Sequence, residues 1–217
     1  MDFKNLFKFL RELDQNNNKP WMDAHRKWYF GVRDEFIFWL DDLDATLAAL
    51  DRGYYPTPGK KGINRINNNL MYHPHKTIYK DHFGAGLDKR PGTGDFYIQI
   101  GLHESLLAGG RWRPDPKALK SIREALDYDG EEFKKILDKK SFKDTFGSLY
   151  EDEKLINAPK GFSNDHPHID LLRHKTFAVV HPLGRAEVLL PDFKEKVIEV
   201  YREMLPFRRY LNKAVMV

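Results

Sequence analysis

The stretch FYIQIGLHESLLAGGRW, residues 96–112, decides the fold. Each half is short and rich in aromatic and aliphatic side chains, which is the composition of a β-strand. His103 and Glu104 leave room between the halves only for a tight turn. A link this short joins antiparallel strands, because a parallel pair needs a crossover of a dozen or more residues. The stretch therefore predicts an antiparallel hairpin.

Further elements are predicted on both sides of this hairpin. Alternating apolar runs at 83–87 and 176–180 read as strands, and apolar residues repeat every three or four positions near both ends of the chain. Asp2 is expected to cap a first helix, and Pro20 to open a long second helix that ends near Asp51. The aromatic stripe of this second helix is expected to pack against the sheet.

The C-terminal half of the chain adds three expectations. Asp115 is predicted to cap a helix that begins at Pro116, and Ser141 to open a capping box for a shorter one. A last helix is predicted from about Pro191, kinked or split near Leu205 because Pro206 falls inside it. The fold class is therefore α+β, a central antiparallel sheet packed by N-terminal and C-terminal helices, in a single domain of residues 1–217.

Composition excludes several classes of protein and of chemistry. Hydrophobic residues make up 41% and charged residues 31% of the 217 positions, as in a globular protein. The chain has no cysteine, which excludes disulfides, thiolate metal sites, iron–sulfur clusters and a cysteine nucleophile. No signal-like N-terminus and no apolar run of membrane-spanning length is evident, so a cytoplasmic protein without a membrane partner is expected.

Positive charge is concentrated in one window. Residues 60–90 hold seven Lys and Arg against two Asp, a net charge of +5 in a chain whose total is +4. A local excess of this kind points to an anionic partner at one place, and equally fits a solvated basic loop.

Basic and hydroxyl side chains in and near this window are candidate ligand-binding residues. Arginine offers a fork that matches carboxylate or phosphate, lysine a point charge, and tyrosine a hydroxyl donor. The alternative is that Arg65 and its neighbours pair with acidic side chains and hold the loop in place. The candidates are Arg65, Lys76, Tyr79, Lys80, His82, Arg111 and Arg173. Gly109 and Gly110, beside Arg111, would let a backbone or a ligand come close, or form a β-bulge.

Two histidine motifs invite a metal or a catalytic interpretation. His73-Pro74-His75 and Asp165-His166-Pro167-His168 carry ligand types that suit zinc or iron, but their spacing favours turns, so no metal site is predicted. An Asp165–His166 pair would act as a general base if it faced the basic segment. Asp165, His166 and Tyr79 are thus the catalytic candidates, and the residues leave the cofactor unknown.

Several motifs together resemble domain-of-unknown-function family 2461, a set of conserved hypothetical proteins. The resemblance covers essentially the whole chain and implies no known activity. The chain departs from the family pattern at Asn68-Asn69-Leu70-Met71, where the family has an Asp-Thr-Arg-Phe-like run. The motifs that carry the resemblance are Phe9-Leu10 with Asn16-Asn17 and Trp21, Tyr79-Lys80 with His82-Phe83-Gly84, Gly109-Gly110 with Trp112 and Pro114, and Gly161-Phe162 with Asp165-His166-Pro167 and Asp170-Leu171-Leu172.

Three functions compete on this reading. The first is binding or turnover of an anionic small molecule, phosphorylated or carboxylated, at a basic cleft. The second is a protein-interaction module without catalysis, with an exposed apolar patch. The third and least favoured is nucleic-acid binding, with bases stacked on Tyr72, Tyr79, Phe83 and Phe96. The sequence assigns neither enzymatic activity, substrate nor oligomeric state.

Overall fold

A computed structural model describes residues 1–151 and 154–215 of the chain. Four strands in this described part pair in the order β1-β2-β3-β4 in one antiparallel sheet, which confirms the α+β class. The strands are β1 (His82–Leu87), β2 (Phe96–Gly101), β3 (Ser105–Arg111) and β4 (Phe177–Leu183). The helices are α1 (Phe3–Gln15), α2 (Lys19–Ala24), α3 (Arg26–Leu50), α4 (Gly59–Gly62), α5 (Pro116–Asp138), α6 (Lys140–Phe146), α7 (Ile169–Leu172), α8 (Arg185–Val188) and α9 (Phe193–Val215).

The chain divides into two compact units, each made of segments far apart in the sequence. Unit 1 comprises Met1–Lys89, Tyr97–Leu107 and Pro182–Val197. Unit 2 comprises the described residues of Arg90–Phe96, Ala108–His181 and Ile198–Val217. The single-domain organisation expected for residues 1–217 stays a prediction. No helix in the described part is long and apolar enough to cross a membrane.

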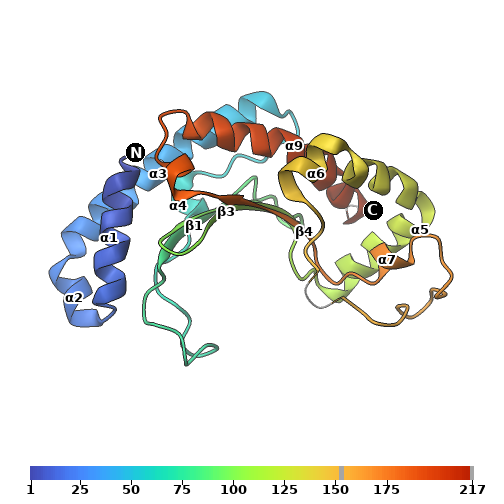
Figure 1. Ribbon diagram of the computed structural model, residues 1–217, viewed down its shortest axis with the longest axis horizontal. Helices are drawn as coiled ribbons and strands as arrows, with labels where there is room; N and C mark the ends of the chain where they lie inside the picture. Colours follow the sequence, from blue (N-terminus) through green and yellow to red (C-terminus); the bar gives the residue numbers. More distant parts are fainter. Residues whose placement is uncertain (152–153, 216–217) are drawn as a thin grey trace. The chain divides into compact units, whose positions relative to one another are not determined.

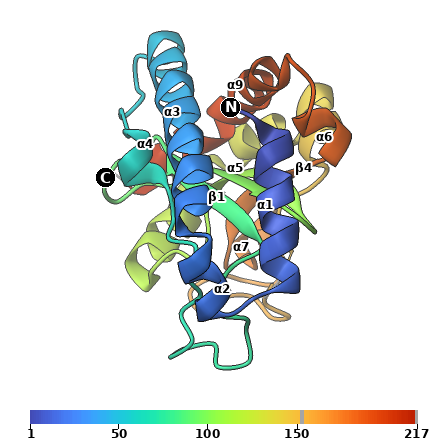
Figure 2. The same ribbon diagram turned by 90° about the vertical axis from the view of Figure 1, so that its left-hand side faces the viewer.

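In unit 1, α1 and α3 lie side by side against β1 (Figure 2). The ring of Phe83 on β1 lies 6.2 Å from the ring of Phe9 on α1 and 5.8 Å from the ring of Phe36 on α3. All three rings are at most 3% exposed. The aromatic stripe of α3 therefore packs against the sheet, as its spacing predicts, and this packing holds α3 in place for the pocket described below.

The long second helix is interrupted at His25, which corrects the expectation of one continuous helix. The backbone of His25 has φ −106° and ψ 15°, outside the helical region, and ends α2 before α3 begins. Its ring stacks on Trp21 at 4.1 Å, and its Nδ1 lies 2.8 Å from the Trp21 carbonyl oxygen. These local contacts stabilise the break, because a side chain that bonds its own preceding turn competes with the helical backbone.

In unit 2, α5 and α6 pack around the C-terminal part of α9 (Figure 1). The ring of Phe207 on α9 lies 5.6 Å from Phe133 on α5 and 5.7 Å from Phe142 on α6. The helix predicted to kink or split near Leu205 does not split, since it runs from Phe193 to Val215 with Pro206 inside it. Burial of its neighbours Met204 and Phe207 offsets the hydrogen bond that proline removes.

Two predicted helix caps in unit 2 have different outcomes. Asp115 caps α5, accepting the Ala118 N–H at 2.9 Å, as predicted. Ser141 does not cap α6, because the helix already begins at Lys140 and the Ser141 hydroxyl donates to Glu203 at 2.8 Å instead. The short side chain therefore serves the contact between α6 and α9.

Protein atoms fill the space beside the glycine pair of β3, which is therefore not an open site. Gly110 has φ +110°, and a Cβ there would overlap the Phe177 carbonyl oxygen. A Cβ at Gly109 would overlap the Met204 sulfur. Strand β4 and helix α9 thus occupy the room that the missing side chains leave, and the pair serves packing.

Candidate functional site

One face of α3 supplies the first wall of a polar pocket in unit 1. Tyr29, Arg33 and Ile37 are spaced by four and therefore lie one above the other on the helix surface. The Arg33 guanidinium lies 4.5 Å from the Phe30 ring centroid and 5.8 Å from that of Tyr29. It also donates to Asp34 at 2.9 and 2.6 Å. Arg33 is thus held flat along the helix.

Helix α4 is brought against this face by a glycine. A Cβ on Gly59 would lie 2.6 Å from the Ile37 carbonyl oxygen, so only glycine permits the approach. Asp41, one turn further along α3, accepts the Gly59 N–H at 2.7 Å. Figure 2 shows α4 beside α3. Lys60 follows Gly59 directly and is therefore placed next to the polar face of α3.

The segment after α4 is tied to β1. Ile63 bridges to Ala85, and the Asn64 N–H donates to the Gly84 carbonyl at 2.8 Å. A Cβ on Gly62 would lie 2.7 Å from the Gly86 carbonyl oxygen, so here too the backbone approaches closely. These contacts fix the backbone that carries Arg65.

The three segments enclose a pocket of about 560 Å³, here called the basic pocket. Its described lining is Tyr29, Arg33, Asp34, Ile37, Lys60, Ile63, Asn64 and Arg65. Of its three cations only Arg33 has a carboxylate partner; Lys60 and Arg65 are exposed and pair with no carboxylate of the described chain. Burial raises the pKa of the Tyr29 hydroxyl, which keeps this donor neutral. The pocket thus combines two cations that have no carboxylate partner with two aliphatic lining residues, Ile37 and Ile63.

Arg65 continues into a pair of extended segments that end in the exposed residues 69–77. Residues 63–85 are here called the basic hairpin. Asn67 bridges to Tyr79, and the Lys80 ammonium donates to the Arg65 carbonyl at 2.6 Å. Burial lowers the pKa of Lys80, and the positive charges of Arg65 and Lys76 lower it further. Three of the predicted ligand-binding residues, Arg65, Lys76 and Lys80, therefore lie near one another.

Tyr79 and His82 are placed differently. Tyr79 is only 6% exposed. Its backbone is held on both sides by the Asn17 side chain, at 2.9 and 3.0 Å. His82 lies 2.9 Å from the Asp81 carboxylate. Both side chains thus have local structural surroundings, which leaves little of Tyr79 for a ligand.

Arg111 and Arg173 belong to unit 2 and contact protein groups there. Arg111 donates to the Gly92 carbonyl at 2.6 Å, and burial lowers the pKa of its guanidinium. Arg173 donates to the Asn164 side chain at 3.3 Å and lies 3.7 Å from Asp170. Each contact fits the role of fixing a loop.

The histidine motif of unit 2 is also internally bonded, and its pairing differs from the expectation. The carboxylate hydrogen-bonded to His166 is Asp127 on α5, at 2.9 Å, whereas Asp165 accepts from Ser163. The other ring nitrogen of His166 accepts the His168 N–H at 3.0 Å, so a neutral ring has both nitrogens occupied. Within residues 1–151 and 154–215, no three His, Asp or Glu side chains gather as metal ligands would.

Comparison with known protein families shows which family the chain belongs to. The family model described as "Conserved hypothetical protein (DUF2461)" matches residues 5–210. The chain belongs to the DUF2461 family. No curated protein and no solved structure matches it. The family resemblance carried by the sequence motifs is thereby confirmed, and the site of this DUF2461 protein rests on its own residues.

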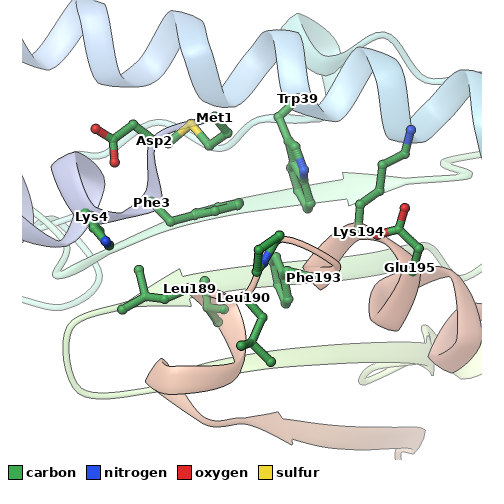
Figure 3. A pocket seen from close by; sticks show the side chains of 12 residues that line it. Met1, Asp2, Phe3, Lys4, Trp39, Leu189, Leu190, Phe193, Lys194 and Glu195 are labelled. Carbon is green, nitrogen blue, oxygen red and sulfur yellow. The ribbon is translucent and has the colours of Figure 1, made fainter.

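A second pocket of unit 1, about 590 Å³, lies where the start of α1 meets α3 and the α8–α9 connection. Figure 3 shows the rings of Phe3, Trp39 and Phe193 turned toward one another. Phe3 meets the other two edge-on at 5.4 and 5.3 Å. Lys194 at its rim is neutralised by Asp42 at 2.6 Å. Its cations and acids are mixed, so this pocket shows no charge preference.

Sequence reasoning missed Tyr29, Arg33 and Lys60 as site residues. Tyr29 and Arg33 lie one position beyond Trp28 and Val32, which belong to the packing stripe. The four-residue spacing of Tyr29, Arg33 and Ile37 is a visible signal of a second helix face. Lys60 belongs to the basic window, and nothing local in the sequence distinguishes it from Lys61.

Proposed function

We propose that this DUF2461 protein binds a small anionic molecule, phosphorylated or carboxylated, in the basic pocket. The observation that carries the proposal is that Lys60 and Arg65 line one pocket with Arg33 and have no carboxylate partner in the described chain. A cation pair without a carboxylate partner, beside two aliphatic side chains, favours a ligand with an anionic head and an organic body. The proposal concerns binding alone and assigns no reaction to the pocket.

Burial of aromatic side chains counts against the nucleic-acid alternative. Of the four rings considered for base stacking, Tyr79, Phe83 and Phe96 are 6%, 3% and 0% exposed. Only Tyr72, at 73%, presents its ring to solvent. A single exposed ring makes a poor stacking platform, because single-stranded nucleic acid is bound by successive stacked bases.

An exposed apolar tip favours a second candidate, protein interaction at residues 70–72 of the basic hairpin. Met71 is 82% exposed and Tyr72 73%. A partner would cover these side chains and leave the basic pocket unused. The two candidates therefore differ in what substitutions in the pocket do to anion binding.

Titration calorimetry with inorganic phosphate tests the proposal. The wild type is compared with Lys60→Gln and Arg65→Gln, and Lys61→Gln serves as a matched control on the same short helix outside the pocket. We expect each pocket variant to weaken phosphate binding by about tenfold, because each removes one charge-assisted contact. Lys61→Gln should bind as the wild type does. Equal binding by all four proteins, or no binding by the wild type, would overturn the proposal and favour the hairpin tip.

A further inference from the structure

Four cations of unit 1 make no ion pair with a carboxylate of the described chain. Lys60, Arg65, Lys76 and Lys80 pair with no carboxylate of the described chain. The nearby acids make contacts with other groups: Asp41 accepts the Gly59 N–H, Asp34 accepts from Arg33, and Asp81 lies 2.9 Å from His82. Four cations of the basic pocket and basic hairpin thus lack an ion-pair partner among the residues that the structure describes.

Two of these cations, Arg65 and Lys80, are held near each other by a paired backbone. The Lys80 N–H donates to the Ile66 carbonyl at 2.8 Å, and the Asn68 N–H donates to the Ile78 carbonyl at 2.9 Å. The Lys80 ammonium is fixed on the Arg65 carbonyl, at 2.6 Å. Arg65 therefore belongs both to the pocket lining and to the hairpin, where Lys80 and Lys76 follow.

The nearby positive charges affect the pKa of Lys80. Besides burial, the charges of Arg65 and Lys76 lower the pKa of its ammonium. Like charges this close repel one another, and an anion that spans them relieves the repulsion. One carboxylate would neutralise only one of the four charges, and a single phosphate at most two.

We infer that the ligand carries at least two linked anionic groups, one in the basic pocket at Lys60 and Arg65 and the next on the basic hairpin at Lys80 and Lys76. This inference rests on the proposed function and deepens it. A small molecule with a diphosphate or triphosphate chain has this chemistry, since linked phosphates present successive charges along one chain. The apolar lining residues Ile37 and Ile63 then contact its organic part.

The test is titration calorimetry with inorganic orthophosphate, pyrophosphate and tripolyphosphate at equal ionic strength and pH. We expect wild-type affinity to rise at least about tenfold from orthophosphate to tripolyphosphate. Lys76→Gln should lose several-fold in affinity for tripolyphosphate and bind orthophosphate as the wild type does. Arg65→Gln should weaken all three. Lys89→Gln, an exposed lysine of the same basic window, is the matched control and should change none of them.

Each outcome decides between the two claims. Equal affinity for the three phosphates, still weakened by Arg65→Gln, would leave the proposed function standing and overturn the linked-anion inference. The same inference fails if Lys76→Gln weakens orthophosphate and tripolyphosphate alike. Absence of binding to every phosphate would overturn the proposed function itself. If a single-stranded oligothymidylate binds far more tightly than tripolyphosphate, the ligand is a nucleic acid and both claims about a small molecule fail.

Discussion

Certain basic side chains of unit 1 differ in their contacts from basic and histidine side chains of unit 2. In unit 2, Arg123 donates to two backbone carbonyls, Arg111 to one, and His166 bonds a carboxylate and a backbone N–H. In unit 1, Lys60 and Arg65 line a pocket and pair with no carboxylate of the described chain. Both sets look alike in sequence, as basic or histidine residues in loops. The partner of a side chain, rather than its type, thus separates the structural role seen in unit 2 from the binding role proposed in unit 1.

Substitution of a glycine in unit 2 should give the largest effect. A Cβ on Gly94 would overlap the Gly110 carbonyl oxygen, and neither backbone can move without disturbing the sheet. We expect Gly94→Ala to lower the free energy of unfolding in urea by about 3 kcal/mol or more. Gly31 on α3 has no atom within 4 Å of its Cβ position, so Gly31→Ala should raise stability by up to about 1 kcal/mol. A Gly94→Ala protein of wild-type stability would contradict this close packing.

A matched pair of arginine substitutions should separate the two uses of polar side chains. Arg123 donates to the Leu172 and His174 carbonyls at 2.9 and 3.2 Å, so Arg123→Gln should cost about 1–3 kcal/mol of stability. Arg65 is exposed, and Arg65→Gln should change stability by less than about 0.5 kcal/mol. Phosphate binding should respond in the reverse order. Urea unfolding and calorimetry on both variants measure this, and a similar stability loss in both would erase the distinction.

The elements of the fold were predictable because their signals are local. The hairpin of residues 96–112 has the composition of two strands and a tight turn within one short stretch. Asp2 and Asp115 each precede a helix and accept a hydrogen bond from a backbone N–H of its first turn. The break between α2 and α3 was less predictable. His25 interrupts a helix through contacts to Trp21 that apolar periodicity does not encode.

The site was predictable only in its charge. The basic window marks Arg65 and Lys80, but the pocket forms because Gly59 approaches the Ile37 carbonyl, a contact between segments far apart in the chain. The same limit applies to His166. Its adjacent Asp165 was the expected partner, whereas the bonded carboxylate comes from Asp127, 39 residues away. In both cases a tertiary contact that the local sequence does not encode determines which groups lie together.

Acid should weaken unit 2 through a buried histidine. Burial lowers the pKa of His174, which is 4% exposed, below its ordinary value of 6.5. The unfolded chain therefore binds more protons, so this contribution is complete above about pH 6.5 and is lost as the pH falls toward the lowered pKa. We expect a loss on the order of 1 kcal/mol between pH 7.5 and 5.5. Urea unfolding at both pH values should show a smaller loss in His174→Gln, and an equal loss would assign the effect to other groups.

The smallest expected effect concerns the one paired cation of the basic pocket. Asp34 holds Arg33 by two hydrogen bonds, at 2.9 and 2.6 Å, and so competes with any ligand anion for that guanidinium. We expect Asp34→Asn to tighten orthophosphate binding by about two- to fivefold, the size of an exposed ion pair. Asp23→Asn is the control, since Asp23 pairs with Lys19 and Arg26 outside the pocket lining. If Asp34→Asn instead weakens binding, Asp34 orients Arg33 toward the ligand, and the pocket needs its internal ion pair as much as its unpaired cations.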